Sequence, residues 1–189
     1  MDIGCVLMAS GFGTRFGANK LLAQAGGVSL VRRALDLYGQ VLFRRRALVS
    51  QYPEILALGA SLGFLPVRNE EAAQGISASA RLGTAALEEM DALLFGVCDQ
   101  PWLSPASVKR LLEAARVHPG DICALSWRGR RGNPVVFPAV FFPELLALTG
   151  DTGGGQIMKR HPDRVRLVEV DHPKELSDID RPEDLLSSP

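Results

Sequence analysis

The feature that most constrains the fold of this chain is an alternation of short β-rich runs with helical segments through its first two thirds. The runs 3–9 and 92–97 are almost continuously apolar, which is typical of strands buried on both faces of a sheet. Strands that alternate with helices form βαβ units, and such units join into a mostly parallel sheet covered by helices. The sequence therefore predicts an α/β fold.

The expected elements cover most of the chain. Ser104 followed by Pro105 marks one helix start, because serine caps helices and proline fits the first helical position. The two strands around the polar turn 128–133 form an expected hairpin that can leave the main sheet. The expected strands are 3–9, 46–50, 64–67, 92–97, 121–127, 134–137 and 164–170. The expected helices are 28–38, 53–63, 77–90, 105–117, 141–148, 155–160 and 182–186.

The size and charge of the chain limit its partners. Its 189 residues suit one domain, and a composition of 47% apolar and 22% charged residues predicts a packed core. The 21 basic and 21 acidic residues cancel, so we expect no long-range attraction to nucleic acid or to an anionic membrane. No apolar run approaches the roughly 18 residues of a membrane span, and we place the protein in the cytoplasm.

A glycine-rich segment, residues 8–20 with the sequence Met-Ala-Ser-Gly-Phe-Gly-Thr-Arg-Phe-Gly-Ala-Asn-Lys, directly follows the first expected strand. Glycine permits positive φ and close approach of the backbone, so such a loop can turn N–H groups toward phosphate oxygens. Arg15 and Lys20 add positive charge to this cradle. The alternative is an ordinary strand-to-helix turn rich in glycine, but the two cations favour phosphate binding.

This loop resembles the signature of molybdenum cofactor cytidylyltransferases, a family of nucleotidyltransferases that append a nucleotide to molybdopterin. That signature is similar to Leu-Ala-Ala-Gly-x-Gly-x-Arg-Phe-Gly-x-x-Lys, and here methionine and serine stand where leucine and the second alanine are usual. The resemblance implies a nucleotide site in this loop. Its residues would be Met8, Ala9, Ser10, Gly11, Gly13, Arg15 and Lys20.

A second segment, residues 69–79, resembles the stretch Asn-…-Gly-x-x-x-Ser that lies beside the nucleotide base in the family. Gly75 lets the backbone approach a flat ring, while Ser77 and Ser79 offer hydroxyl groups at the entrance of a helix. The alternative is that these hydroxyls cap the helix. With the resemblance, we expect Asn69, Gly75 and Ser77 to contact the nucleotide, and Ser79 to cap the helix or pack.

Asp99 comes just after the expected strand 92–97, at the sheet edge where open α/β sheets bind ligands. Residues 98–101, Cys-Asp-Gln-Pro, resemble the family's Gly-Asp-Met-Pro or Gly-Asp-Gln-Pro. A carboxylate is the hard oxygen ligand that Mg²⁺ takes in proteins, so Asp99 is the leading metal ligand. The alternative is an aspartate that starts a turn before a proline.

A second carboxylate comes from residues 178–184, Asp-Ile-Asp-Arg-Pro-Glu-Asp, which resemble the ending Asp-Ile-Asp-Thr-Pro-x-Asp of the cytidylyltransferase branch. In extended backbone the alternation puts Asp178 and Asp180 on one side and turns Ile179 toward the core. We expect Asp180 to hold the metal together with Asp99. Asp178 is a nearby second choice.

Two weaker resemblances concern the molecule that accepts the nucleotide. Residues 132–137 look like the family's Gly-x-Pro loop and strand, and residues 148–153 look like its Gly-Asp-x-Gly turn. The resemblance implies that Asn133 and Asp151 line the pterin side, and that an arginine of residues 128–131 can pair with an acceptor phosphate. The alternative is that both segments are only turns.

The resemblance runs from about residue 3 to residue 185 and implies a Rossmann-like three-layer α/β/α sandwich with a mostly parallel sheet, as in nucleotide-diphospho-sugar transferases. It divides one domain into a nucleotide-binding half, about 1–103, and an acceptor-binding half, about 104–189. The implied reaction is Mg²⁺-dependent transfer of CMP from CTP, or of another nucleotide, to the terminal phosphate of molybdopterin or the molybdenum cofactor. Arg15, Lys20 and Asp99 would be catalytic.

Three alternatives remain open at this stage. A guanylyltransferase of the same cofactor, or a transferase for a sugar or polyol phosphate, would share the loop and the metal chemistry. A third alternative is a cofactor-binding chaperone that consumes no nucleotide and serves a molybdenum hydroxylase. The resemblance implies such a hydroxylase as a possible recipient of the product, and it implies neither a nucleic acid nor a membrane as a partner.

Overall fold

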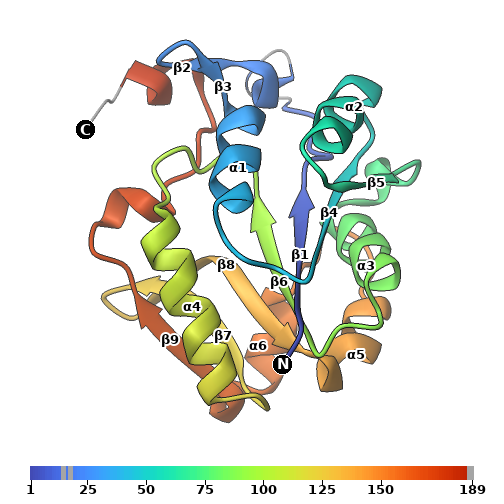
Figure 1. The fold of residues 1–189 in the computed structure, drawn as a ribbon, viewed down its shortest axis with the longest axis vertical. Coiled ribbons are helices and arrows are strands. Elements are labelled where there is room, and N and C mark those ends of the chain that lie inside the picture. Colours follow the sequence, from blue (N-terminus) through green and yellow to red (C-terminus); the bar gives the residue numbers. More distant parts are fainter. Residues whose placement is uncertain (14–15, 17–18, 187–189) are drawn as a thin grey trace.

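The computed structural model describes residues 1–13, 16 and 19–186, and Figure 1 shows how their elements are arranged. Within these residues, seven strands form one sheet in the order β5-β4-β1-β6-β8-β7-β9, and β2 and β3 form a separate hairpin. The strands are β1 (Ile3–Met8), β2 (Gln24–Ala25), β3 (Val28–Ser29), β4 (Arg45–Ser50), β5 (Leu65–Arg68), β6 (Ala92–Val97), β7 (Ile122–Trp127), β8 (Arg130–Pro138) and β9 (Val165–Glu169).

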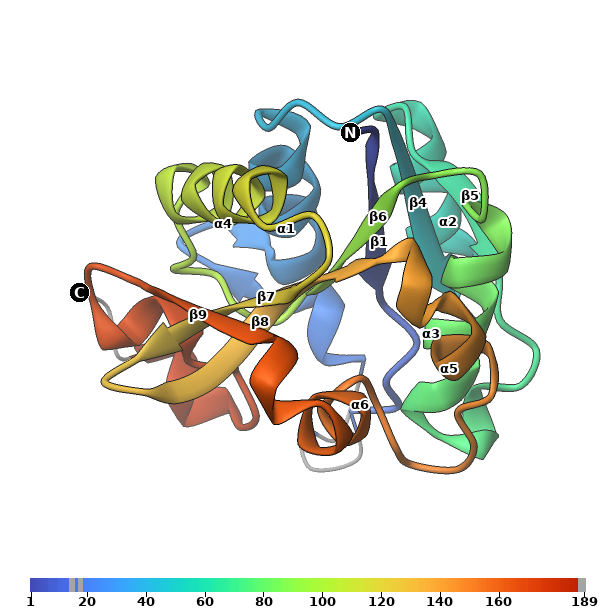
Figure 2. The same ribbon diagram turned by 90° about the horizontal axis from the view of Figure 1, so that it is seen from below.

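Helices cover both faces of this sheet, as the view along the sheet in Figure 2 shows. The α-helices are α1 (Leu30–Gly39), α2 (Pro53–Ser61), α3 (Ile76–Ala86), α4 (Pro105–Val117), α5 (Phe142–Leu146) and α6 (Gly155–Arg160). The short 3₁₀ helices are η1 (Lys20–Leu22), η2 (Ala72–Gln74), η3 (Ala139–Phe141), η4 (Pro162–Arg164), η5 (Pro173–Leu176) and η6 (Pro182–Leu186).

The two helical layers pack on side chains that alternate along the central strands. Cys5 and Leu7 of β1 belong to the core cluster under α1, α2 and α4, whereas Val6 belongs to the cluster under α3, α5 and α6. Successive side chains of a strand point to opposite faces, so a strand covered on both faces must be apolar throughout. The predicted three-layer α/β/α sandwich with a mostly parallel sheet is therefore confirmed.

The hairpin of β7 and β8 stays inside the main sheet, and the expectation that it leaves the sheet is wrong. β8 pairs antiparallel with β6 on one side and with β7 on the other, and β7 pairs parallel with β9. Val136 lies opposite Leu94 of β6 and Cys123 of β7, and its side chain is fully buried. A strand with such apolar side chains on both faces gains stability only when strands and helices cover it.

The turn of this hairpin is shorter than expected. Trp127 pairs with Arg130, so the turn residues are Arg128 and Gly129, with φ values of 49° and 76°. Positive φ at both central residues is the geometry of a type I′ turn, which matches the twist of the two strands. The strand β8 consequently begins at Arg130, four residues before the expected start at Pro134.

Helix α3 also differs in length from the expectation, because it ends at Ala86 and not near residue 90. Leu87 and Met90 still face the core from the following turn, so the apolar pattern continues past the end of the helix. The start of α4 agrees with the expectation, since the Ser104 hydroxyl accepts a hydrogen bond from the N–H of Ser107 and Pro105 occupies the first turn.

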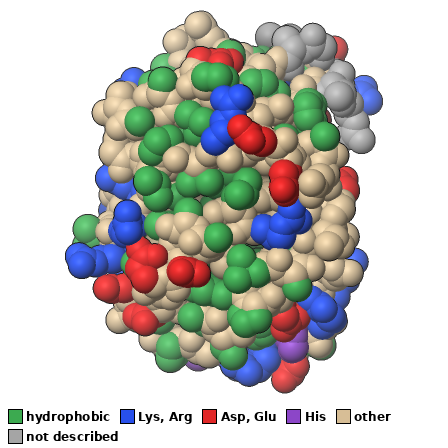
Figure 3. Space-filling view, turned by 90° about the vertical axis from the view of Figure 1, so that its right-hand side faces the viewer, with side chains coloured by type: hydrophobic (Ala, Val, Ile, Leu, Met, Phe, Trp, Pro, Cys, Tyr) green, Lys and Arg blue, Asp and Glu red, His purple; other side chains and the backbone are tan. Residues whose placement is uncertain are grey.

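Charged side chains of both signs are interspersed on the face of the molecule that carries α2, β5 and α3, and hydrophobic side chains lie between them (Figure 3). This mixture agrees with the formal net charge of zero. None of the helices in the described ranges is both long enough and apolar enough to span a bilayer.

Candidate active site

A pocket of about 370 Å³ lies at the carboxyl ends of β1 and β6. The chain leaves β1 into the glycine-rich loop and leaves β6 into the segment that carries Asp99, so both segments reach this edge of the sheet. Residues of the loop, of the start of α3 and of the end of β6 line the pocket. They are Met8, Ser10, Gly11, Phe12, Gly13, Lys20, Leu21, Ala72, Gly75, Ile76, Ser79, Val97, Cys98, Asp99 and Asp151.

The backbone of the loop is held from the segment that follows β4. The side-chain amide of Gln51 donates to the carbonyl of Ser10 at 2.7 Å, and the hydroxyl of Tyr52 donates to the carbonyl of Gly11 at 3.1 Å. In a trans peptide the N–H lies opposite the carbonyl, so the N–H groups of Gly11 and Phe12 point away from these two side chains. Such an arrangement suits an anion on the pocket side.

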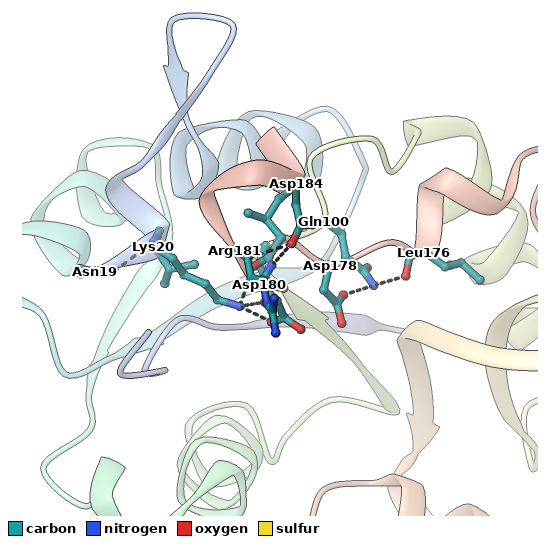
Figure 4. Close-up of polar contacts among 11 residues, drawn as sticks. Asn19, Lys20, Gln100, Leu176, Asp178, Asp180, Arg181 and Asp184 are labelled. Carbon is teal, nitrogen blue, oxygen red and sulfur yellow. Dashed lines mark hydrogen bonds and ion pairs between the residues drawn. The ribbon is translucent and has the colours of Figure 1, made fainter. Parts of the chain in front are cut away.

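Lys20 brings together carboxylates from distant parts of the chain. Its ammonium nitrogen lies 2.7 Å from Oδ2 of Asp99 and 3.3 Å from Oδ1 of Asp180, and it donates to the carbonyl of Ile179 at 2.9 Å. Figure 4 shows Lys20 reaching from η1 toward Asp180. Burial lowers the pKa of Lys20, but the two carboxylates raise it more, so its pKa is raised above the usual value and the side chain stays charged.

The position of Lys20 follows from the local sequence. The side chain of Asn19 caps η1 by accepting a hydrogen bond from the N–H of Leu21 at 3.2 Å. Leu21 is buried in the core, which anchors the short helix at the edge of the sheet. Lys20 therefore begins a fixed turn and projects across the pocket.

One carboxylate oxygen of Asp99 is left unpaired by the described residues. Its side chain is 18% exposed, and its Oδ1 atom is buried with no hydrogen-bond partner among the described residues. The N–H of Ile179 donates to the backbone carbonyl of Asp99 at 2.9 Å, which fixes the segment 178–180 beside this carboxylate. A buried, unpaired carboxylate oxygen is costly, and a cation in the pocket would satisfy it.

Asp178 faces a different partner from Asp180. The side-chain amide of Gln100 donates to Oδ1 of Asp178 at 2.9 Å and to the carbonyl of Leu176 at 3.3 Å (Figure 4). Burial raises the pKa of Asp178, and the charge of Asp99 adds to this effect. The side chain of Ile179, between the two aspartates, is fully buried, as the alternation predicts.

The position of Asp180 is fixed by hydrogen bonds to η6. The backbone N–H groups of Asp180 and Arg181 donate to Oδ2 of Asp184 at 2.9 and 2.8 Å. These bonds close the turn that leads into the final helix (Figure 4). The expected contribution of this region to the site therefore comes from a turn, and not from a regular strand.

The donor set fits a divalent cation held with help from a nucleotide. Among the described residues, no group of three or more histidine, cysteine, aspartate or glutamate side chains is arranged to hold a metal ion alone. Mg²⁺ commonly takes one or two protein carboxylates and completes its shell with phosphate oxygens and water. Asp99 and Asp180, which share contacts with the Lys20 ammonium, match that requirement.

Asn69, Gly75 and Ser77 occupy different positions relative to the pocket. Gly75 lines it and has φ of 99°, and a β-carbon there would lie 2.7 Å from the backbone of residues 150–151. Asn69 is almost fully buried behind the lining and bonds to Ser10 and Ser79. Ser77 is fully buried, and its hydroxyl accepts a hydrogen bond from Arg81.

The two residues expected on the acceptor side lie in different pockets. Asp151 lines the first pocket, and its carboxylate faces the N–H of Ile76 at 3.5 Å. Asn133, which precedes a cis peptide bond to Pro134, lines a second, mostly apolar pocket of about 200 Å³. Met8 and Ile76 line both pockets, so the two share a wall.

Most of the loop residues that the sequence singles out come together at the first pocket. Ala9 is the exception among the described ones, because it is buried and its N–H bonds to the carbonyl of Val49. Arg15 lies outside the described residues. The sequence reasoning missed Ser79 as a pocket residue, although its spacing of three from Ile76, which also lines the pocket, places both on one face of α3, whereas Ser77 points elsewhere.

The fold and the site together define the class of the protein, which is a nucleotidyltransferase with the fold of nucleotide-diphospho-sugar transferases. More specifically, the chain belongs to the MobA-like NTP transferase domain family, whose model matches residues 5–165.

Two proteins with similar sequences have names that describe different activities. Nicotine blue oxidoreductase from Paenarthrobacter nicotinovorans is 28% identical over 201 residues, which cover 97% of this chain and 96% of that protein. Molybdenum cofactor guanylyltransferase from Rhodobacter capsulatus is 34% identical over 120 residues, 62% of each chain.

Solved structures extend the comparison. Rv0371c from Mycobacterium tuberculosis H37Rv has a TM-score of 0.86 and 26% identity, covering 100% of this chain and 98% of that one. A complex of Rv0371c with manganese has a TM-score of 0.74 and 25% identity, covering 91% of this chain and 90% of that one. Nucleotidyltransferases of this family are metal-dependent.

Proposed function

We propose that this protein transfers CMP from CTP to the terminal phosphate of molybdopterin, or of its molybdenum-loaded form, and releases pyrophosphate in a Mg²⁺-dependent reaction. One observation carries the proposal: Asp99 and Asp180 contact the same ammonium group at the rim of a pocket lined by Gly11 and Gly13. The choice of CTP rests on the resemblance of residues 178–180 to the ending of the cytidylyltransferase branch.

The proposed chemistry is an in-line displacement. An oxygen of the acceptor phosphate attacks the α-phosphorus of CTP, and the bond from that phosphorus to the bridging oxygen of the β-phosphate breaks. No covalent bond to the protein forms, so the protein acts by positioning the groups and by balancing charge. Bound Mg²⁺ would neutralise and orient the triphosphate.

Each residue of the site has a proposed task. Asp99 and Asp180 hold the cation, and the loop backbone at Gly11 and Phe12 holds phosphate oxygens. Lys20 neutralises charge that grows on the departing pyrophosphate, and Arg15 is expected to assist it. Residues 1–103 supply most of the lining of the first pocket, and the proposed acceptor half, 104–189, contributes Asp151 to it. Asp180 of that half contacts Lys20, which belongs to the lining.

The acceptor is expected beside the second pocket, which Asn133 lines and which shares a wall with the first. We expect the reaction to take place in the cytoplasm and its product to pass to a molybdenum hydroxylase. The hydroxylase is implied by the family resemblance, and the cytoplasmic location is the expectation drawn from the apolar runs of the sequence.

Product analysis tests the proposal directly. The purified protein is incubated with Mg²⁺, molybdopterin and each nucleoside triphosphate in turn, and the product is identified by mass spectrometry while pyrophosphate is measured. A CMP adduct is expected. A GMP adduct would make the protein a guanylyltransferase. A product formed only with a sugar or polyol phosphate would show that this phosphate, and not molybdopterin, is the acceptor. Cofactor binding without nucleotide consumption would indicate a chaperone.

The name of the Paenarthrobacter relative calls for one further control. The protein is supplied with a reduced nicotinamide cofactor and an electron-accepting dye, without nucleoside triphosphate. We expect no oxidation of the nicotinamide. Turnover in this assay, together with no pyrophosphate release in the first, would contradict the proposed function.

Replacing Asp99 with alanine tests the metal assignment. Losing one contact that stabilises transition-state charge costs about 2.7 to 4 kcal/mol, or a hundred- to a thousand-fold in rate. We therefore expect the Asp99→Ala variant to release pyrophosphate at least about a hundred times more slowly at saturating Mg²⁺. A turnover near that of the unmodified protein would remove Asp99 from the metal site.

A further inference from the structure

Arg81 of α3 bonds to three separate segments of the chain. Its Nη2 atom donates to Oε2 of Glu71 at 2.7 Å and to Oε1 of Gln74 at 3.1 Å, and these two residues cap and end η2. Its Nη1 atom donates to the carbonyl of Leu148 at 2.9 Å and to the hydroxyl of Ser77 at 3.3 Å. One guanidinium group thus holds η2, the first turn of α3 and the turn that follows α5.

The segments that Arg81 holds supply part of the lining of both pockets. Gly75, between η2 and α3, lines the first pocket, and so does Asp151 of the turn 148–151. Ile76 lines both pockets. The side chain of Arg81 is 23% exposed and lines neither of them. Arg81 can therefore act on a bound molecule only through the segments that it holds.

The start of α3 contacts the turn 148–151 directly at Gly75, where an added β-carbon would lie 2.7 Å from the backbone of that turn. Among the described residues, α3 makes two other hydrogen bonds to the turn, from the N–H groups of Ile76 and Ser77 at 3.5 and 3.4 Å. Both exceed the usual limit of about 3.2 Å for such bonds. The 2.9 Å bond from the charged Arg81 is the stronger link, because a charged donor strengthens a hydrogen bond. The helix α5, which precedes the turn, also packs against α3 (Figure 2).

We infer that Arg81 is a positioning residue, which keeps the segment 71–77 against the turn 148–151 and thereby fixes how the nucleotide and the acceptor lie relative to each other. This inference rests on the proposed function, in which Gly75 contacts the nucleotide and Asp151 lies on the acceptor side. Reacting atoms must lie within about 3–3.5 Å of each other, and a displacement of about 1 Å can cost about a hundred-fold in rate. The rigid, planar fork of arginine suits this task, since it donates in two directions from separate nitrogens.

Hydrogen exchange followed by NMR tests the contact without any ligand. The N–H groups of Ile76 and Ser77 report on it directly, because they donate across it. We expect Arg81→Met to speed their exchange about ten-fold or more, the effect of losing a hydrogen bond from a charged group. The exchange of the central strand β6 should change less, because it reports the unfolding of the whole protein.

Two further measurements test the positioning role in the Arg81→Met variant. Pyrophosphate release is measured with saturating CTP, molybdopterin and Mg²⁺, and the binding of inorganic tripolyphosphate with Mg²⁺ is measured by calorimetry. We expect kcat to fall about ten- to a hundred-fold. The affinity for tripolyphosphate should not change, because the loop backbone and Lys20, which are proposed to hold the phosphates, lie outside the segments that Arg81 holds.

The control variant is Arg164→Met. The guanidinium of Arg164 also donates to a carboxylate, that of Asp121, and to a backbone carbonyl, that of Gly120, but it lines neither pocket. This variant should change neither the local exchange at the start of α3 nor kcat. Arg81→Lys keeps the charge on a single nitrogen and should show both effects of Arg81→Met at reduced size, so it provides the test if the methionine variant does not fold.

The possible outcomes distinguish the inference from the function on which it rests. The inference is overturned if the exchange of Ile76 and Ser77 does not rise above that of β6. It is equally overturned if their exchange rises while kcat stays unchanged, or if tripolyphosphate binding weakens as much as kcat falls. If the unmodified protein transfers no nucleotide to any acceptor, the proposed function fails, and the exchange measurement still decides whether Arg81 holds the two segments together.

Discussion

Replacing Lys20 with methionine should destabilise the metal-free protein and should turn Mg²⁺ into a stabiliser of the variant. Methionine keeps an unbranched, flexible stem but lacks the ammonium group that contacts Asp99 and Asp180. The two carboxylates then face each other without a cation. Mg²⁺ can restore the missing charge, because it binds the same kind of oxygen.

The size of the loss follows from the exposure of the partners. Removing one member of a fully buried ion pair costs about 3–5 kcal/mol, and an exposed pair contributes about 0–1 kcal/mol. The side chains of Lys20 and Asp99 are 15% and 18% exposed, and that of Asp180 is 55% exposed. The contact with Asp99 should dominate, so we expect a loss of about 2 to 3 kcal/mol.

The pH of the measurement matters little in the neutral range. The folded-state pKa of Lys20 is raised, so its contribution to stability is complete below the pKa of an unfolded lysine and is lost as the pH rises through the raised value. Urea unfolding at pH 7 therefore measures the full effect. Each protein is unfolded with and without Mg²⁺, at equal ionic strength.

The control is Lys109→Met, which removes the same charge from an exposed position on α4. It should change stability by less than about 0.5 kcal/mol. The reasoning is refuted if Lys20→Met is as stable as the unmodified protein, or if Mg²⁺ stabilises both proteins equally.

Two further predictions concern the segment that carries the second carboxylate. Asp178→Asn should stabilise the protein at pH 7, because burial and the charge of Asp99 raise the pKa of Asp178 and so disfavour its charged form. The gain in stability should disappear as the pH falls below 3.8, the ordinary pKa of an aspartate. Equal stability of the variant and the unmodified protein at pH 7 would contradict this prediction. Glu175→Gln should cost about 1–3 kcal/mol at neutral pH, because the buried carboxylate accepts from the N–H and the hydroxyl at the start of α4. Burial raises the pKa of Glu175 but its hydrogen bonds lower it more, so this difference should shrink as the pH falls through the lowered pKa, and an unchanged difference in acid would refute the assignment. Urea unfolding at several pH values measures both variants.

The sequence predicts the three-layer sandwich well because its central strands can be recognised from their own residues. The observed bounds of β6, Ala92–Val97, are the expected ones, and β1 ends one residue before the expected end. Burial on both faces demands a continuous apolar run, and such a run is visible without knowledge of its partners. The order of the strands could not be predicted in this way, because the position of β8 between β6 and β7 depends on pairing between distant parts of the chain.

The approach of Asp99 and Asp180 to each other could be predicted in part. Asp99 ends a recognisable strand, and the family resemblance of residues 178–180 supplied the second carboxylate. Nothing local in the sequence shows that Lys20 joins them, because this contact spans 160 residues of chain between Lys20 and Asp180. The family resemblance therefore predicted that the two carboxylates lie close together, whereas the strand pattern alone pointed only to Asp99.

The hydrogen bonds of Asn69 and of the two serines beside it could not be predicted from the sequence. Asn69 is expected to contact the nucleotide, yet its amide lies behind the pocket wall and directs two serine hydroxyls. Whether a hydroxyl donates or accepts depends on all its partners, and for Ser10 these come from positions 49 and 69. A serine in a motif identifies a polar position, but the folded neighbours decide which hydrogen bond it can offer to a base. The hydrogen bonds available at this wall thus depend on the packed segments after β1, in β4, after β5 and in α3, and they cannot be assigned to one motif.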